Sequence, residues 1–108
     1  MNRVLRTLLA VAISTSACIT TGTYVRTGDR QLPRRPADCE FAIYSVPPPS
    51  FVELGVVELI PATPDLEAAH DAARPYVCAA GGDGLVILRG GEHDSIQRGT
   101  IIKRSESP

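Results

Sequence analysis

The pattern of apolar and polar residues predicts β-strands along two stretches in the middle of the chain. Residues 41–46 (FAIYSV) and 51–60 (FVELGVVELI) are rich in β-branched and aromatic side chains. In the second stretch apolar residues alternate with polar ones or with Gly55, a candidate site for a β-bulge. Because proline cannot donate to a sheet ladder, we expect the first strand to end at 47–49 and the second at Pro61.

A helical period follows the second predicted strand. Leu66, Ala69 and Ala73 recur at the spacing of one helix face. Thr63 can cap a helix and Pro64 suits the first helical position, so the helix is predicted to begin there.

The end of this helix is predicted from Pro75 and from the glycine-rich stretch 78–87 (CAAGGDGLVI). Pro75 removes a backbone donor, which predicts a kink or a break followed by one short turn. Gly81 or Gly82 should end the helix with a positive φ angle. Phosphate-binding loops run from a strand through glycines into a helix. Here the glycines follow a helix and precede a strand, so the stretch is interpreted as a corner of the fold.

Two further strands complete the predicted sheet. Residues 85–88 are four consecutive aliphatics, typical of a strand buried on both faces, and 99–104 (GTIIKR) form the last strand. The sequence therefore predicts an α+β domain over 38–104, in which a small β-β-α-β-β sheet carries one helix packed on one face. Residues 105–108 are expected to be a tail.

The N-terminus has the pattern of an export signal. Arg3 and Arg6 provide a short positive region, and 8–13 form a compact apolar segment that is followed by small residues up to Ala17. A membrane-spanning helix needs about 20 apolar residues, which is longer than this run. We therefore expect a signal peptide over 1–17.

The end of this signal resembles a bacterial lipobox, in which a cysteine becomes the acylated first residue of the mature protein. Residues 15–18 read TSAC, although this family usually has a large aliphatic residue at the position of Thr15. By this resemblance Cys18 is lipidated, and Ile19 as the second mature residue implies sorting to the outer membrane. The alternative is ordinary cleavage after Ala17, which would release a soluble protein.

Residues 18–37 contain the lipidated Cys18 and are expected to form a flexible tether. The segment is rich in Thr, Gly, Arg and Pro, has little periodicity, and would have a coil dimension of about 25 Å. Its arginines could contact anionic headgroups, or the segment could be a solvated spacer. These arginines are Arg26, Arg30, Arg34 and Arg35.

The chain has three cysteines, an odd number for an exported protein. If Cys18 carries lipid, Cys39 and Cys78 remain as a pair for a disulfide in an oxidising compartment. They form no C-x-x-C motif, which argues against a redox site. A closed loop of about 40 residues would add roughly 3–4 kcal/mol to stability.

One polar cluster, 92–94, is a candidate metal site. Glu92, His93 and Asp94 offer carboxylates beside an imidazole, but consecutive residues in a turn seldom converge on one ion. A solvated loop is the preferred interpretation, and the same holds for His70 and Asp71 on the helix. A zinc site would have to combine the histidines with the domain cysteines, whose separations follow no structural zinc pattern.

Length and composition narrow the classes of function. A chain of 108 residues has room for one domain, and 44% hydrophobic residues with 21% charged ones are ordinary for a globular protein. The formal net charge of −1 provides no basic surface for nucleic acid. Ser95 lies too near His93 and Asp94 in sequence for a triad, and no GxSxG or HExxH motif occurs. We expect neither an enzyme nor a cofactor.

Several short motifs occur together over 39–103. They are Cys39, Val46-Pro47, Glu53-Leu54-Gly55, Val57, Ala68-Ala69, 82–87 and Gly99. As a set they resemble a family of small bacterial envelope lipoproteins that includes the Rcs-pathway outer-membrane stress-sensor lipoprotein. The resemblance implies the fold and the anchored, exported state. The sensor's domain has four cysteines in two disulfides and a longer proline-rich linker, so its signalling role is not carried over.

The sequence as a whole predicts a lipoprotein of the bacterial cell envelope whose disulfide-bonded domain has a binding, sensory or structural role. Its partners would be the bilayer, through acylated Cys18, and an envelope protein. The alternative is a soluble periplasmic or secreted module, for example one that binds a metal.

Overall fold

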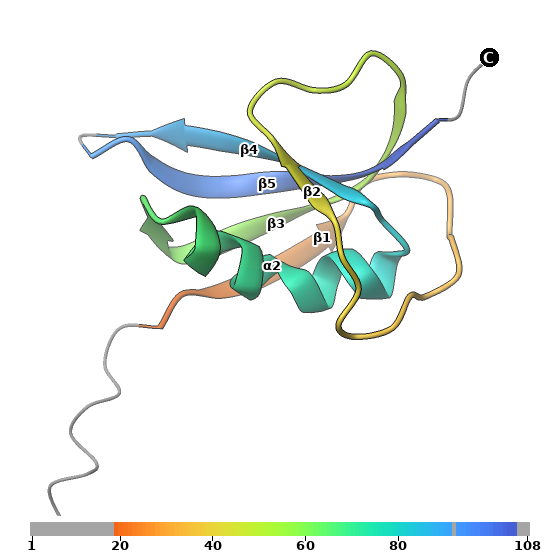
Figure 1. Cartoon of the computed structure of the whole chain (residues 1–108), viewed down its shortest axis with the longest axis horizontal. Coiled ribbons are helices and arrows are strands. Elements are labelled where there is room, and N and C mark those ends of the chain that lie inside the picture. The colour runs from red at the N-terminus through yellow and green to blue at the C-terminus, as the bar shows by residue number, and fades with distance from the viewer. Residues whose placement is uncertain (1–18, 92, 106–108) are drawn as a thin grey trace, which may run out of the picture.

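In the computed structural model, residues 19–91 and 93–105 are described, and they form one five-stranded sheet with a helix against it (Figure 1). The strands lie in the order β1-β3-β5-β4-β2. Neighbours are antiparallel except β2 and β4, which are parallel. The elements are β1 Thr21–Arg26, β2 Ala42–Tyr44, β3 Phe51–Thr63, α2 Leu66–Ala80, β4 Gly84–Gly90 and β5 Ser95–Arg104.

The predicted α+β class with a helix on one face of a small sheet is confirmed, but the predicted order β-β-α-β-β lacks a strand. The additional strand, β1, lies inside 18–37, where a flexible tether was expected. It pairs with β3 from Thr21 opposite Ile60 to Arg26 opposite Gly55. Thr, Tyr and Val favour strands, and Tyr24 also packs against the core. The tether prediction is therefore wrong for these six residues.

Strand β3 confirms one prediction and corrects another. Its register with β5 shifts between Glu53 and Gly55, at the glycine predicted to mark a bulge. Pro61 does not end the strand, which continues to Thr63. The pairing with β5 is interrupted between Glu58 and Thr63. Proline is therefore tolerated at position 61, because no regular ladder with β5 requires a backbone N–H there.

The other strands differ from their predictions in length. The first predicted strand, 41–46, is reduced to Ala42–Tyr44. The fourth, 85–88, extends to Gly84–Gly90, and the last, 99–104, begins earlier, at Ser95. In β4 Leu88 is 51% exposed, so this strand is not buried on both faces along its whole length.

The helix begins two residues later than the cap at Thr63 predicted. Asp65 is the N-cap, and its carboxylate accepts a hydrogen bond from the Glu67 N–H at 3.1 Å. Thr63 instead accepts from the Asp65 N–H through its hydroxyl, also at 3.1 Å. Pro75 lies inside the helix without breaking it. Its ring is on the exposed face, as is Asp71, whose carbonyl loses the helical hydrogen bond.

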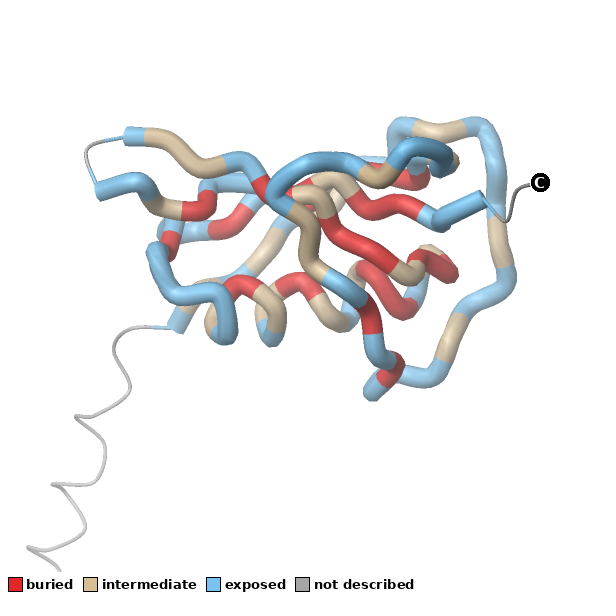
Figure 2. Tube along the Cα trace, turned by 45° about the horizontal axis from the view of Figure 1, so that its top comes forward, coloured by how far each residue is buried: buried red, intermediate tan, exposed pale blue. Residues whose placement is uncertain are grey.

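The main core lies between α2 and the sheet (Figure 2). Ala69, Ala73 and Val77 are completely buried, and their small side chains bring the helix close to the strands. Gly99 is required here, because a Cβ atom would lie 2.6 Å from the Leu85 side chain. The helix-facing side of the sheet is therefore filled by aliphatic side chains, and the Leu85 side chain lies over the Cα atom of Gly99.

The opposite face of the sheet has no helix over it among the described residues. One row in register crosses all five strands there and is mostly apolar. Ile102, next to this row, is fully buried outside the main core cluster. The row consists of Val25, Val56, Thr100, Val86 and Tyr44.

Candidate functional site

The predicted lipidation site, Cys18, and the metal candidate Glu92 lie outside the described residues, as do residues 1–17 and the tail beyond Ser105. The other two metal candidates, His93 and Asp94, are exposed in the turn between β4 and β5. Asp94 has a φ of 52°, its N–H donates to the Gly91 carbonyl, and its own carbonyl accepts from Arg89 at 2.9 Å. Within 19–91 and 93–105, no three His, Cys, Asp or Glu residues are grouped to hold a metal.

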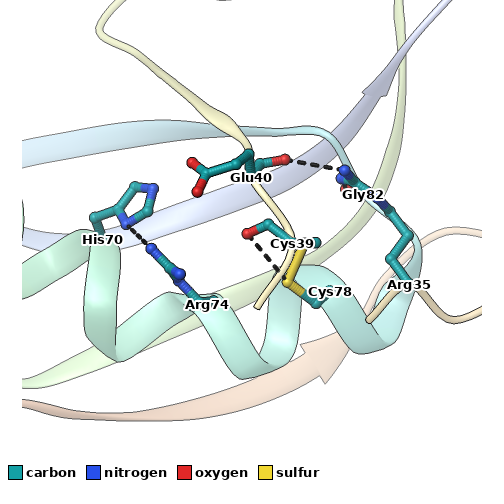
Figure 3. The surroundings of a disulfide bond; sticks show 7 residues. All are labelled: Arg35, Cys39, Glu40, His70, Arg74, Cys78 and Gly82. Atoms are coloured by element: carbon teal, nitrogen blue, oxygen red, sulfur yellow. Dashed lines mark hydrogen bonds between the residues drawn. A yellow bond between two sulfur atoms is a disulfide. The ribbon is translucent and has the colours of Figure 1, made fainter. Parts of the chain in front are cut away.

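The predicted disulfide between Cys39 and Cys78 is confirmed (Figure 3). The Cα atoms are 5.8 Å apart, and the two cysteines are 39 residues apart in sequence. Both are buried, so the bond joins the segment before β2 to the last turn of α2 inside the core. Its role in the domain is structural, because neither sulfur is presented to solvent.

Gly81 ends the helix as predicted, with a φ of 81°. Its N–H donates to the Cys78 carbonyl at 3.1 Å, and the Gly82 N–H donates to the Val77 carbonyl at 3.0 Å. This is the hydrogen-bond pattern of a helix ended by a left-handed glycine. The site has no room for a side chain, since a Cβ at Gly81 would lie 2.6 Å from the Pro33 carbonyl oxygen.

The residues that crowd Gly81 belong to the segment 30–36, which we call the strap. It was predicted to be part of the flexible tether, but it packs on the C-terminal end of α2. The Arg35 N–H donates to the Cys78 carbonyl at 2.8 Å. Its guanidinium donates to the Glu40 carbonyl at 3.0 Å and to the Gly82 carbonyl (Figure 3). A cation is favourable at a helix C-terminus, and the Arg35 backbone N–H donates to a carbonyl of the last helical turn.

We call these residues together the cystine corner: Cys39, Cys78, Gly81, Gly82 and the strap. Next to the corner, the Asp83 carboxylate accepts from the Arg104 N–H at 3.0 Å and lies 3.5 Å from the Lys103 ammonium group. The end of the sheet, the end of the helix and the strap are therefore joined by one disulfide and several charge-assisted hydrogen bonds.

His70, expected on a solvated helix face, is mostly buried. Its side chain is 20% exposed, and its ring stacks on Phe41 with centroids 4.1 Å apart and an interplanar angle of 5°. The Arg74 guanidinium lies 3.2 Å from the Nδ1 atom of His70. The sequence prediction is corrected here because Phe41, just after the disulfide, folds over the helix and covers the imidazole.

Three hollows, of about 220, 290 and 410 Å³, lie near the cystine corner: one beside β1, one beside Asp83 and the end of β5, and one between the strap and the last turn of α2. The first lies beside β1, where the rings of Tyr24 and Tyr76 stack with centroids 6.1 Å apart. Tyr76 donates to the Gly22 carbonyl at 2.8 Å, and Arg26 and Arg30 border the opening. Phenol and guanidinium groups suit stacking and hydrogen bonding with a bound group. The volume of this first hollow, about 220 Å³, is below the roughly 300 Å³ of a typical ligand pocket.

The end of the domain farthest from the cystine corner exposes large apolar side chains. Ile19 is 66% exposed, Ile60 56% and Leu66 46%. Pro61 and Ala62, which follow Ile60 in the chain, are exposed as well. We call these five residues the apolar end. Within the described parts of the chain, the structure contains no helix that is both long and apolar enough to span a bilayer.

Comparisons with protein-family models, with curated proteins and with solved structures find no match to this chain. The resemblance to the Rcs-pathway sensor lipoproteins therefore stays a prediction.

Sequence reasoning missed the strap, the hollow beside β1 and the apolar end. A signal for β1 was present, because Thr21–Arg26 reads TGTYVR, with the β-branched and aromatic residues of a strand. Its Thr and Gly were instead interpreted as a linker composition. No local signal identified Arg35, whose partners lie 5 to 47 residues away in sequence.

Proposed function

We propose that this chain is an exported bacterial lipoprotein, acylated at Cys18, whose domain acts by binding in the cell envelope rather than by catalysis. The observation that carries the proposal is the pairing of Cys39 with Cys78. Structural disulfides persist in oxidising compartments, which agrees with the export signal predicted over 1–17.

The pairing also leaves Cys18 as the odd cysteine of the chain. An exported protein with an odd cysteine needs a separate use for it, and acylation within the TSAC motif is such a use. The resemblance of this motif to a lipobox, with Ile19 after the cysteine, favours the outer membrane as the location.

A binding role is favoured by the kind of groups that surround the hollows. Tyrosines and arginines, which border the hollow beside β1, are enriched at sites where one protein recognises another. The partners in this proposal are the bilayer, through the lipid on Cys18, and an envelope protein.

The test is the intact mass of the full chain, purified from the membrane fraction of an expressing bacterium, with and without reductant. We expect a diacylglycerol-containing adduct and a gain of about two daltons on reduction, because one disulfide takes up two hydrogens. The Cys18→Ser variant should lose the adduct and keep the gain, whereas a Cys39→Ser/Cys78→Ser variant should keep the adduct and lose the gain.

Unmodified Cys18 in soluble protein would contradict the lipoprotein proposal. It would favour the alternative, a soluble periplasmic or secreted binding module released by cleavage after Ala17.

A further inference from the structure

Only two residues, Ile19 and Thr20, separate Cys18 from the first strand, which begins at Thr21. An extended chain advances at most about 3.3–3.6 Å per residue, so Thr21 lies within about 11 Å of the Cys18 backbone. The headgroup layer on each side of a bilayer is about 5–8 Å thick. A lipid on Cys18 would therefore hold the start of β1 directly against the headgroups, with no flexible spacer between them.

Two side-chain hydrogen bonds hold the start of the described chain against the end of β3. The Thr21 hydroxyl donates to the Ile60 carbonyl at 3.2 Å, and the Thr20 hydroxyl donates to the Pro61 carbonyl at 3.3 Å. Ile19 therefore lies beside the last part of β3. The start of β1, the end of β3 and the start of α2, with Leu66, lie at the same end of the molecule (Figure 1).

We propose that the apolar end of the domain (Ile19, Ile60, Pro61, Ala62 and Leu66) docks on the lipid bilayer and inserts its side chains among the headgroups. This inference rests on the proposed acylation of Cys18. Exposed large apolar side chains gain free energy when they leave water for the headgroup–acyl boundary. They would add a protein contact to the membrane beside the two or more acyl chains on Cys18, which already provide stable anchoring, so the contact would fix the orientation of the domain.

The contact is apolar rather than electrostatic. Exposed charged residues near the apolar end include Asp65 and Glu67 at the start of α2. Glu58, two residues before Ile60 on β3, is exposed as well and pairs with Arg98 at 3.1 Å. Carboxylates gain nothing from anionic lipid, so docking should occur on zwitterionic vesicles and should be insensitive to salt. The cystine corner, about 20 Å away along the 15-residue helix, would then be turned from the bilayer toward other envelope components.

The chain contains no tryptophan, so one introduced tryptophan reports on its own position without background. The probe is Ile60→Trp, and the matched control is Phe51→Trp on the same strand. Both residues are exposed, at 56% and 37%, and with the bulge between them they lie on the same face. They are nine positions apart, or about 30 Å along a strand. The control carries the same intrinsic preference of tryptophan for interfaces.

The full-length acylated variants would be reconstituted in phosphatidylcholine vesicles that contain bromine-labelled acyl chains. We expect the brominated lipid to reduce the emission of Ile60→Trp by about twofold and to leave that of Phe51→Trp unchanged. Leu66→Trp is a second probe, with the same expectation, in case Ile60→Trp does not fold. Raising the salt concentration to 1 M should not reduce the quenching.

Equal quenching of probe and control in acylated, vesicle-bound protein would overturn the docking while leaving the lipoprotein proposal intact. A blue-shifted but unquenched Ile60→Trp emission would place protein, such as a second copy of the chain, on this end and would also overturn it. Quenching that is lost at high salt would overturn the apolar mode. Absence of lipid on Cys18, seen by mass, would refute the proposed function and this inference together.

Discussion

The two ends of the domain are built in different ways. At the cystine corner a disulfide, a left-handed glycine cap and the Arg35 guanidinium join the helix, the strap and the segment before β2. At the apolar end the chain is held by two threonine hydroxyls and the Asp65 cap, and its largest side chains face outward. The cystine corner is thus stabilised by covalent and polar interactions, whereas the large apolar side chains of the apolar end remain exposed and can contact a membrane or a partner.

If the corner carries the stability, removal of the disulfide should have the largest effect. The double variant Cys39→Ala/Cys78→Ala should lose about 3–4 kcal/mol of unfolding free energy, because the loop of about 40 residues is no longer closed in the unfolded chain. The measurement is urea unfolding followed by circular dichroism.

Reductant supplies the control for this experiment. It should lower the stability of the native protein by a similar amount and leave that of the double variant unchanged. A loss below about 1 kcal/mol would show that the cap and Arg35 hold the corner without the disulfide.

The next largest effect is expected at Gly81, where the strap crowds the cap. Gly81→Ala should cost about 2–3 kcal/mol of unfolding free energy, because alanine disfavours the left-handed region and its Cβ would meet Pro33 and Leu32. Gly91→Ala is the matched control. Its φ is 84°, but the nearest atom to a Cβ there is 3.6 Å away, so the backbone term alone, about 1–2 kcal/mol, should remain.

Equal losses for the two glycine variants in the same urea titration would mean that the strap moves aside without cost. The strap would then be the flexible tether that the sequence suggested.

The smallest effect on stability is expected at the apolar end. Ile60→Ala should change the unfolding free energy by about 0.5 kcal/mol, because the side chain is 56% exposed. Leu59→Ala, one residue away and 5% exposed, should cost about 2–5 kcal/mol in the same assay. A large loss for Ile60→Ala would show that this end contributes to the core and is not free for membrane contact.

Much of the domain could be predicted from local patterns. The alternation in β3, the helical period of Leu66, Ala69 and Ala73, and the helix-ending glycine all follow from the physics of a few neighbouring residues. The disulfide followed from counting cysteines, because after Cys18 is set aside only one pair is left.

The features that were missed depend on contacts between distant segments. Pro75 alone predicts an interrupted helix, but α2 continues through it, because packing on the sheet holds the flanking turns in place. His70 alone is a polar helix residue, and only the fold of the chain after Cys39 brings Phe41 over its ring.

The sequence by itself determined the class of fold, the cysteine pairing and the glycine corner, because each depends on local backbone preferences or on simple counting. The tertiary structure alone decided what 19–36 does. The local preferences of a short Thr- and Gly-containing segment are too weak to favour strand over coil. Its conformation is instead fixed by pairing with the edge of β3 and by contact with the C-terminal end of α2. As a consequence, the tether predicted over 18–37 is reduced to the two residues between Cys18 and β1, and the domain would be held close to the predicted anchor.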